Sequence, residues 1–373
     1  MDFNLDETQQ DLKKLAADVL DRDGDEERLW QAGLMGVCVP EEAGGAGLGP
    51  VEMAVVLREV GARAAAVPAL PTLAGTLVLA RHGSPDQQRR CAGRVTLALR
   101  EPGHALAHPP ATTARPAGDL SLTPMAPAGA TPPVPAGATP PAPAGSAPSA
   151  GSAPPAGSAP SASPAPVGGW VLDGRKVSVP YPGAAVLVTA DEGLFLLDSP
   201  TATAEFTSTG EPAGTIVLDG TRAEHVAGPE AVADARHVFT AAVAAQAAGV
   251  LAGALELTTA YIRQRKQFGR ALAEFQAVTM QIADVYIAGR ALDVAMWSAA
   301  WRLGEDLPVE EDLALAAYHV GGAVQALHTC QHLHGGLGLD VTYPLHRYFA
   351  QAKHLSHLLG GAGAQLDLIG AFV

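Results

Sequence analysis

A segment with very few large apolar side chains, which a packed core needs, lies near the middle of the chain. Of the 30 prolines in the 373 residues, 14 fall between Pro124 and Pro166, and most of the remaining residues there are alanine, glycine or serine. The sequence PAGATPP at Pro127–Pro133 recurs at Pro135–Pro141, a period too short for a solenoid repeat. Such sequence buries too little apolar surface to offset its ordering entropy. We therefore predict a disordered insert over about residues 115–166 inside a folded domain, with a semi-rigid extended spacer as the alternative.

Charge and composition exclude several classes of protein. The formal net charge of −14 leaves no basic surface for a phosphate backbone, so we expect no nucleic-acid partner. Charge, glycine or proline interrupts every apolar run before it reaches membrane-spanning length, and the first ten residues do not resemble a signal peptide. The cysteines Cys38, Cys91 and Cys330 are far apart and odd in number, which fits a reducing compartment. We expect a cytoplasmic protein with no membrane contact.

The residues outside the insert fall into three parts with different hydrophobic periodicity. Residues 1–97 are mostly helical in pattern and predict an N-terminal α-helical domain. Residues 98–228 contain short alternating segments and predict a middle antiparallel β domain that holds the insert. Residues 229–373 contain long helical segments joined by short links and predict a C-terminal four-helix bundle. The expected fold class is α+β.

The same patterns place the individual elements. The expected helices cover Glu7–Leu20, Asp25–Leu34, Val51–Gly61, His237–Gln264, Glu274–Leu303, Glu310–Leu333 and Leu345–Leu359. The expected strands cover Val95–Leu99, Trp170–Leu172, Ala185–Val188, Leu194–Leu197 and Thr215–Leu218. Turn residues are expected to separate several of these strands, at Asp173-Gly174, Pro182-Gly183 and Asp219-Gly220.

The stretch YIRQRKQFGRALAEFQ at Tyr261–Gln276 concentrates positive charge in an acidic protein. Four basic residues lie where one predicted helix ends, namely Arg263, Arg265, Lys266 and Arg270. Basic residues at a helix C-terminus can simply complement the helix dipole. They can also form an anion site, in which arginine binds pyrophosphate through its fork and a neighbouring aromatic ring stacks on a nucleotide base. The residues alone leave both interpretations open.

Motifs along nearly the whole chain outside the insert resemble those of one family. A Y-x-x-x-R-x-x-F-G…FQ signature is formed by Tyr261, Arg265, Phe268, Gly269, Phe275 and Gln276. Further matches are Leu29-Trp30 with Gly33–Pro40 and Gly44–Gly49, the EPG turn at Glu101–Gly103, WVLDGRK at Trp170–Lys176, and HLHGGLG at His332–Gly338. Each motif is weak alone, but their order is specific. The chain resembles the acyl-CoA dehydrogenase family.

This resemblance implies a fold, a cofactor and a reaction. The family has a helical N-terminal domain, a middle β domain and a C-terminal four-helix bundle. Its members use FAD to oxidise an acyl-CoA thioester at the α and β carbons, with a glutamate carboxylate as the general base. Each FAD is held by two chains. The residues that resemble those lent to a neighbour's FAD are Arg265, Phe268, Gln276, Gln331, His332, Gly335 and Gly336, and His332 stands where members have glutamine.

The positions that match the family's catalytic base carry side chains that accept no proton. The usual position lies 24 residues after the first glycine of the GG pair, which is Leu359 in this chain. The alternative position lies 26 residues before the signature arginine, which is Phe239. The carboxylates Asp367 and Glu256 match no known base position. The resemblance therefore implies no catalytic residue in this chain.

Positions that face a chain's own flavin also differ from the family pattern. Arg100 replaces the threonine before the EPG turn, and residues 105–107 read Ala-Leu-Ala instead of Gly-Ser-Asp. Ser178 and Pro180 stand where members carry an aromatic residue and a threonine or serine, and proline also removes a backbone donor. The insert falls between the EPG turn and the WVLDGRK hairpin. A site no longer used for flavin tolerates such an insertion well.

The chain keeps the residues that contact a neighbour's FAD and lacks those that form its own flavin site. This contrast implies a partner subunit. The chain resembles the base-lacking subunit of actinobacterial heteromeric α2β2 acyl-CoA dehydrogenases that act on steroid side-chain CoA esters in cholesterol catabolism. The resemblance implies a base-bearing paralogue as partner, an acyl-CoA substrate, and an electron-transfer flavoprotein as acceptor. The alternatives are an autonomous homo-oligomeric flavoprotein with an atypical base such as His354 or His357, and a non-catalytic scaffold subunit.

Histidines gather in the C-terminal half, at His319, His328, His332, His334, His346, His354 and His357. On a helix, His328 and His332 share one face, while Cys330 and His334 project from another. Zinc needs three or four convergent ligands, so we predict no metal site. Cys330 is interpreted as a small buried apolar residue.

Overall fold

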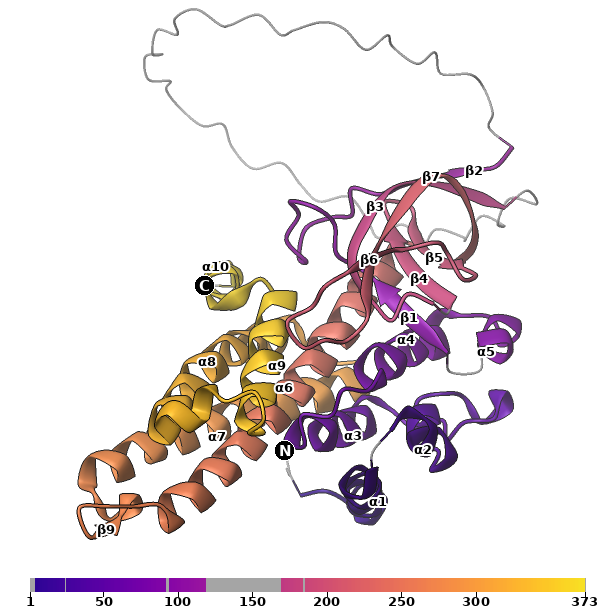
Figure 1. Cartoon of the computed structure of the whole chain (residues 1–373). Coiled ribbons are helices and arrows are strands. Elements are labelled where there is room, and N and C mark those ends of the chain that lie inside the picture. The colour runs from indigo at the N-terminus through magenta and orange to yellow at the C-terminus, as the bar shows by residue number, and fades with distance from the viewer. Residues whose placement is uncertain (1–3, 24, 92–93, 119–168, 184, 373) are drawn as a thin grey trace, which may run out of the picture.

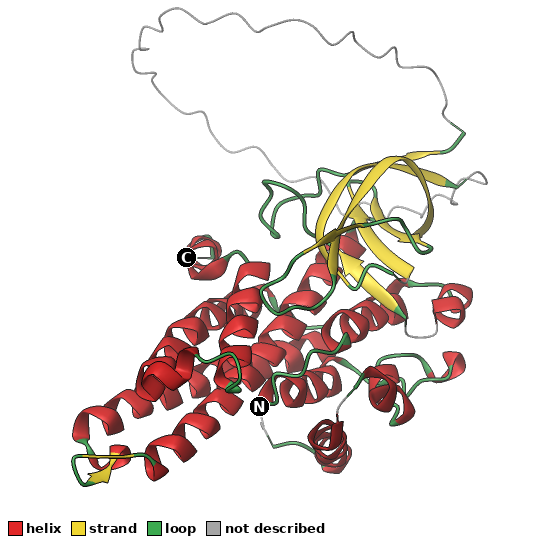
Figure 2. Cartoon of the chain, viewed as in Figure 1, coloured by secondary structure: helices red, strands yellow, loops and turns green. Residues whose placement is uncertain are grey.

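The computed structural model describes residues 4–23, 25–91, 94–118, 169–183 and 185–372. The proline-rich tract at 124–166 therefore lies outside the described residues. The described chain has three parts, with helices at both ends of the sequence and a β domain between them (Figures 1 and 2). This arrangement confirms the three-part α+β fold that the sequence patterns and the resemblance predicted.

The N-terminal part consists of five α-helices. They are α1 (Glu7–Asp23), α2 (Glu26–Gln31), α3 (Pro50–Ala62), α4 (Ala69–His82) and α5 (Pro85–Cys91). The three expected helices correspond to α1, α2 and α3. Helix α4 was not predicted, because every residue from Ala69 to Leu79 is buried and the helix has no polar face to produce a helical periodicity.

The middle part is a strongly curved seven-stranded sheet (Figure 2). Its strands are β1 (Val95–Ala98), β2 (Thr113–Pro116), β3 (Trp170–Pro180), β4 (Ala185–Ala190), β5 (Gly193–Leu197), β6 (Thr203–Glu205) and β7 (Ala213–Ala227). The order is β1-β4-β5-β7-β3-β2, with β6 paired to β7. All pairs are antiparallel except β1 with β4, which is parallel. Strand β2 includes residues 115 and 116, the first two of the predicted insert.

Two of the three expected turns lie inside long strands, so that prediction was wrong. Asp173-Gly174 belongs to β3 and Asp219-Gly220 belongs to β7. The two strands pair with each other and shift register between Leu172 and Gly174, as a β-bulge does. The Asp173 carboxylate accepts a hydrogen bond of 2.7 Å from the Gly220 amide across the bulge. Turn-forming residues therefore bend these strands without ending them.

The C-terminal part contains the four predicted long helices and one more. They are α6 (Glu230–Gln264), α7 (Gln276–Gly304), α8 (Glu310–His334), α9 (Leu345–Leu358) and α10 (Gly361–Gly370). Helix α10 was not predicted, because Gly360-Gly361 was interpreted as the end of the last helix. These glycines adopt φ values of +82° and +79°, which redirect the chain into α10.

Helix α6 lies at the centre of the molecule and joins the N-terminal helices to the bundle (Figure 1). A Cβ atom on Gly61 of α3 would lie 2.0 Å from the Gln246 carbonyl oxygen, and one on Gly249 would lie 1.9 Å from that of Arg58. The two backbones therefore touch only because both positions are glycine. Among the described residues, α6 is long and apolar enough to cross a membrane, but 83% of its most apolar window is buried inside the structure.

Candidate functional site

A tight hairpin connects α6 to α7 at the end of the bundle farthest from the β domain (Figure 1). Strands β8 (Lys266–Gln267) and β9 (Arg270–Ala271) pair across the two-residue turn Phe268-Gly269, and both turn residues have positive φ, +52° and +83°. This left-handed conformation is common for glycine but unfavourable for phenylalanine. The Phe268 side chain is also 93% exposed. Backbone strain together with a fully exposed aromatic ring indicates a binding role.

Arg265 lies beside this hairpin with its backbone held in place. The Arg265 amide donates to the Tyr261 carbonyl at 2.8 Å, and the Arg265 carbonyl accepts from the Leu272 amide at 2.8 Å, so the backbone is fixed at both ends. Within the described part of the chain, its exposed side chain forms no ion pair. Arg270 differs, because its guanidinium carbon lies 3.9 Å from the centre of the Phe275 ring. Arg265 is therefore free to take an anion, as are the exposed side chains of Arg263 and Lys266, which form no ion pair among the described residues either.

Gln276 is the first residue of α7 and is exposed next to this arginine-rich turn. The first turn of α7 contains no acidic residue, and Phe275 at the N-cap supplies no side-chain hydrogen bond. The first amides of a helix have no intrahelical acceptor and carry partial positive charge. This helix start and Arg265 thus present amide and guanidinium donors at the same end of the bundle.

The remaining predicted cofactor residues lie in the last turn of α8 and directly after it, at the same end of the bundle as the hairpin. His332, Gly335 and Gly336 are exposed, and the Gln331 side-chain amide donates to the Gly338 carbonyl at 3.1 Å. The buried His334 ring stacks on Tyr261 with centroids 4.3 Å apart, which fixes the end of α8 against the end of α6. The structure therefore brings the seven predicted residues to one end of one helical bundle.

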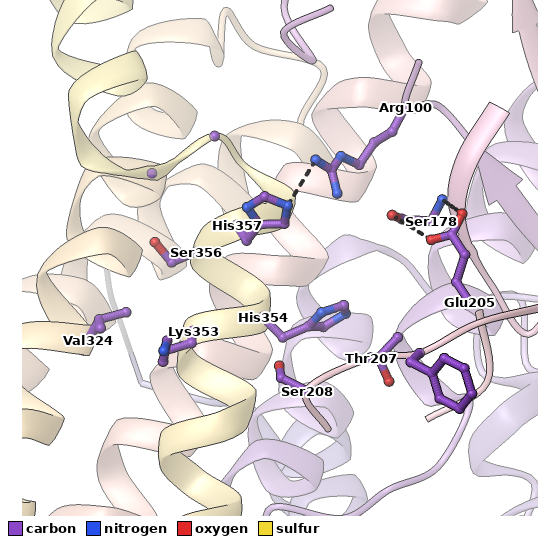
Figure 3. A pocket seen from close by; sticks show the side chains of 13 residues that line it. Arg100, Ser178, Glu205, Thr207, Ser208, Val324, Lys353, His354, Ser356 and His357 are labelled. Carbon is purple, nitrogen blue, oxygen red and sulfur yellow. Dashed lines mark hydrogen bonds between the residues drawn. The ribbon is translucent and has the colours of Figure 1, made fainter. Parts of the chain in front are cut away.

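A second region of interest is a pocket of about 550 Å³ between the β domain and helices α8–α10. Figure 3 shows side chains that line it, and they come from both domains. Arg100, Ser178 and Glu205 come from the β domain, while His354 and His357 come from α9. The pocket is at the β-domain end of the bundle, opposite the hairpin.

The two residues at the expected base positions are apolar and buried. Leu359 follows α9 directly, is 3% exposed, and precedes Gly360 of the pocket wall. Phe239 lies in α6 and is 4% exposed. The carboxylates of Glu256 and Asp367 are exposed and do not line the pocket.

Among the described residues, Glu205 is the carboxylate that lines the pocket. Burial would raise its pKa, but hydrogen bonds from Thr215 and from the backbone and hydroxyl of Ser178, together with the charge of Arg100, lower it. A carboxylate held in this way is a weak proton acceptor. Burial, aided by the charges of Arg100 and His357, lowers the pKa of His354, which weakens that imidazole as a base too.

The altered flavin-facing positions have new contacts in the structure. Arg100 reaches into the pocket and places its Nη2 atom 3.5 Å from Nε2 of His357 (Figure 3). Ser178 adopts φ +52° and donates to Glu205 from its amide at 3.2 Å and its hydroxyl at 3.1 Å. Arg236 donates to the carbonyl of Ala107, the last residue of the Ala-Leu-Ala stretch, and to that of the next residue, His108. The pocket thus holds an arginine–imidazole contact that a sequence motif does not reveal.

The retained EPG and WVLDGRK motifs meet in a buried ion pair. The Lys176 ammonium lies 2.5 Å from a Glu101 carboxylate oxygen, and the two side chains are 0% and 5% exposed. The amides of Ala111 and Thr112 and the Thr112 hydroxyl also donate to this carboxylate, at 2.5, 3.0 and 2.5 Å. Burial raises the pKa of Glu101, but these donors and Lys176 outweigh it and lower that pKa well below its usual value. The EPG and WVLDGRK motifs therefore have a structural role in this chain, because each supplies one partner of the buried ion pair.

The described residues contain no group of three or more histidine, cysteine, aspartate or glutamate side chains that could hold a metal ion. Of the histidines in the C-terminal half, His334 stacks on Tyr261 and His328 packs edge-on against Phe349, with ring centroids 4.8 Å apart. These rings therefore have packing roles within the bundle.

Comparison with known families agrees with this architecture. The model of the acyl-CoA dehydrogenase N-terminal domain matches residues 7–96, and that of the acyl-CoA dehydrogenase C-terminal domain matches residues 228–373. The chain belongs to the acyl-CoA dehydrogenase family. FAD, the cofactor that the resemblance implied, is the cofactor of this family. PigA, solved with FAD, has the same fold at a TM-score of 0.73 and 19% identity.

Two relatives from Mycobacterium tuberculosis align along the full length. Acyl-CoA dehydrogenase FadE28 is 37% identical over 391 residues, covering 100% of this chain and 98% of that protein. Acyl-CoA dehydrogenase FadE27 is 30% identical over 401 residues, covering 99% and 98%.

Two solved structures with similar sequence are complexes of two different chains. A variant of the Tcur3481-Tcur3483 steroid ACAD has a TM-score of 0.79 and 33% identity, and the match covers 98% of this chain and 97% of that one. The ChsE4-ChsE5 complex from Mycobacterium tuberculosis has a TM-score of 0.78 and 29% identity, with coverage of 100% and 98%.

Proposed function

We propose that this chain is the subunit without a catalytic base in a heteromeric FAD-dependent acyl-CoA dehydrogenase. In this assembly it completes the FAD site of a base-bearing paralogue. The observation that carries the proposal is the contrast between the two ends of the bundle. One end presents a nearly complete set of the family's residues for binding a dinucleotide, with His332 in place of glutamine, while neither expected base position carries a proton acceptor.

The alternative base position and Arg265 are too far apart to contact one cofactor. Phe239 and Arg265 lie 26 residues apart on the chain, and all but the last of these residues belong to α6. At 1.5 Å per residue this separation is about 39 Å, which exceeds the length of an extended FAD molecule. Arg265 therefore acts on a cofactor whose reacting ring is held by another chain.

The chain's own pocket is poorly suited to flavin. Arg100 reaches into the space between the β domain and α9 and contacts His357, and Pro180 of β3 offers no amide hydrogen to a ring. Leu359 provides no proton acceptor. These features support a subunit that binds FAD only at the shared end of the bundle.

FAD supplies the acceptor for the β-hydrogen of the acyl-CoA, and this chain's part is to hold the cofactor. Arg265 provides a bidentate fork for the pyrophosphate. Phe268 offers its exposed ring face to the dinucleotide, and the strained turn keeps that ring away from the protein's own core. Gln276, Gln331 and His332 supply hydrogen-bonding groups, and Gly335-Gly336 allow close approach of the backbone.

An exposed apolar stripe on α7 supports the requirement for a partner. Met280, Ile287, Val294 and Trp301 recur every seven residues and are 62%, 63%, 47% and 37% exposed. Side chains seven residues apart lie on the same face of a helix, and a continuous exposed apolar face marks an interaction surface. The stripe is suited to packing against a helix of another subunit.

Replacing Ile287 with aspartate is expected to weaken the assembly of the two subunits by roughly tenfold or more, because the carboxylate would be buried without a partner. Analytical ultracentrifugation over a concentration series measures the change. Val217→Asp is the matched control, since Val217 is 60% exposed but lies on β7, away from the stripe. Equal weakening by both variants would contradict the assignment of the stripe as an interface.

Expression of the chain alone and together with its base-bearing paralogue tests the proposed function. The chain alone is expected to be colourless and inactive, and the co-expressed pair is expected to be yellow and to oxidise acyl-CoA. The absorbance spectrum and a dye-reduction assay give the two readouts. A yellow, active protein obtained from this chain alone would refute the proposal and favour the autonomous enzyme. A complex whose flavin content does not depend on this chain would favour the scaffold.

The finer parts of the proposal rest on the relatives. The steroid ACAD named above supports a steroid side-chain CoA as substrate, in a β-oxidation step, and the two-chain complexes support an α2β2 assembly. An electron-transfer flavoprotein is proposed as the acceptor, and the cytoplasm as the location. His357 as an atypical base is disfavoured, because its Nε2 atom is already in contact with the Arg100 guanidinium, 3.5 Å away.

A further inference from the structure

The pocket at the β-domain end of the bundle has a charge pattern that the proposed function does not use. The cationic side chains of Arg100 and Lys353 line it together with the imidazoles of His354 and His357, against the single carboxylate of Glu205. Figure 3 shows Arg100, His357 and His354 on the side of α9 that faces the β domain, while Lys353 lies on the other side of that helix. A pocket with a surplus of cations attracts anions.

Among the described residues, the one carboxylate forms no direct ion pair with Arg100. Glu205 is engaged by the amide and the hydroxyl of Ser178, at 3.2 and 3.1 Å, and by the Thr215 hydroxyl. Among the described residues Arg100 forms no ion pair, and its nearest polar contact is the imidazole of His357 at 3.5 Å. Burial lowers the pKa of Arg100, but the guanidinium stays charged at neutral pH. A half-buried cation without a direct ion-pair partner is stabilised by an anion that binds next to it.

The opposite wall of the pocket leaves room for an oxyanion. Gly360 and Gly361 both adopt left-handed conformations, and a Cβ atom on Gly361 would meet nothing within 4 Å. Helix α10 starts at Gly361 and has no acidic residue in its first turn, so its free amides add partial positive charge to the wall. These amides supplement the charge of Arg100.

The pocket is larger than a simple anion requires. Its volume of about 550 Å³ leaves space for an organic group attached to the anion. Phe206 lines the pocket and its ring is fully exposed, so a planar ring can stack on it. The combination of a cationic end and an aromatic residue defines one chemical class of ligand.

We propose that this pocket binds a phosphomonoester of a small heteroaromatic compound, of the mononucleotide class, with the phosphate between Arg100 and His357. The Arg100 and His357 side chains and the start of α10 offer several hydrogen-bond donors. Such a set suits the phosphate dianion of a ligand better than it suits a ligand carboxylate. This site is separate from the FAD contacts around Arg265 at the other end of the bundle, and it exists whether or not the chain shares a partner's flavin.

Calorimetric titration of adenosine monophosphate into the FAD-saturated complex tests the proposal. One molecule is expected to bind per copy of this chain, and Arg100→Gln is expected to weaken binding at least tenfold. Arg222→Gln is the control, because Arg222 is an exposed arginine of β7 outside the pocket. Adenosine and ribose 5-phosphate, which each lack one half of the ligand, are expected to bind more weakly than the monophosphate. Absence of binding, or equal binding by the Arg100→Gln and wild-type proteins, would overturn the proposal.

Two further variants show whether the monophosphate binds in this pocket or at the FAD contacts. His357→Gln is expected to weaken binding several-fold and provides a second test if Arg100→Gln does not fold, as judged by circular dichroism. Arg265→Ala is expected to leave binding of the monophosphate unchanged. Loss of binding in Arg265→Ala together with normal binding in Arg100→Gln would place the ligand at the FAD contacts and refute a separate site. This result would leave the shared-subunit proposal intact.

Discussion

Replacing Arg265 with alanine is expected to lower the affinity of the assembled complex for FAD by about 10- to 100-fold. A charge-assisted hydrogen bond contributes about 1.5–3 kcal/mol, and a tenfold change in affinity corresponds to about 1.4 kcal/mol. The arginine is free to deliver this contribution because its side chain forms no ion pair within the described residues, while its backbone is fixed by Tyr261 and Leu272. Fluorescence titration of FAD into the apo-complex measures the change.

Arg263→Ala is the matched control for this experiment. Arg263 is exposed at the same helix end, two residues before Arg265, so its removal changes the local charge equally without touching the signature position. Arg265→Lys adds a test of geometry, because lysine keeps the charge but loses the planar fork. An equal loss of FAD affinity in the Arg263 and Arg265 alanine variants would show that general charge, rather than a specific contact, attracts the cofactor.

Replacing Lys176 with methionine is expected to destabilise the protein by about 3–5 kcal/mol, because it leaves the Glu101 carboxylate buried without its counter-ion. Urea unfolding followed by circular dichroism measures the change in the free energy of unfolding. Lys14→Met, at an exposed position of α1, is expected to be nearly neutral. The double variant Glu101→Gln with Lys176→Met removes both charges and is expected to recover most of the loss. A double variant as unstable as the single one would contradict the role assigned to the ion pair.

The same pair predicts how stability depends on pH. The folded-state pKa of Glu101 is about 2, below its usual value of 4.5. A lowered folded-state pKa means that the carboxylate's contribution is complete above pH 4.5 and is lost as the pH falls from there towards 2. The wild-type protein is therefore expected to lose more stability than the double variant between pH 5 and pH 3. Parallel unfolding curves of the two proteins over this range would count against the assigned shift.

The sequence predicted elements well where one face of a segment is polar and failed where burial is uniform. The alternation in α1 follows from its half-exposed position at the surface of the fold. Helix α3 is largely buried, and its pattern comes from the polar residues Glu52, Arg58 and Glu59. Helix α4 is buried from Ala69 to Leu79, so its pattern has no helical period to detect. The sequence predicts chain reversals at Asp173-Gly174 and Asp219-Gly220, because turn residues and bulge residues are the same residue types. Only the pairing of β3 with β7 distinguishes the two.

In the candidate site, too, the sequence predicted contacts between residues that are close in the chain and did not predict contacts between distant ones. The hairpin around Phe268 was predictable because all of its residues lie within one short stretch of sequence. The contact of Arg100 with His357 joins residues 257 positions apart, and the pair of Glu101 with Lys176 joins residues on either side of the predicted insert. Neither contact can be predicted from the spacing of residues along the chain. Both depend on how the β domain sits against α9.

The exposed stripe on α7 has a consequence for the cell that makes this protein. An unaccompanied copy presents Ile287, Met280 and the bare ring of Phe268 to water, and exposed apolar side chains of this kind are what chaperones and proteases recognise in unassembled proteins. Surplus copies would be degraded sooner than assembled ones. The abundance of this chain would then follow the supply of its partner, so that the ratio of the two subunits is set by turnover as well as by synthesis.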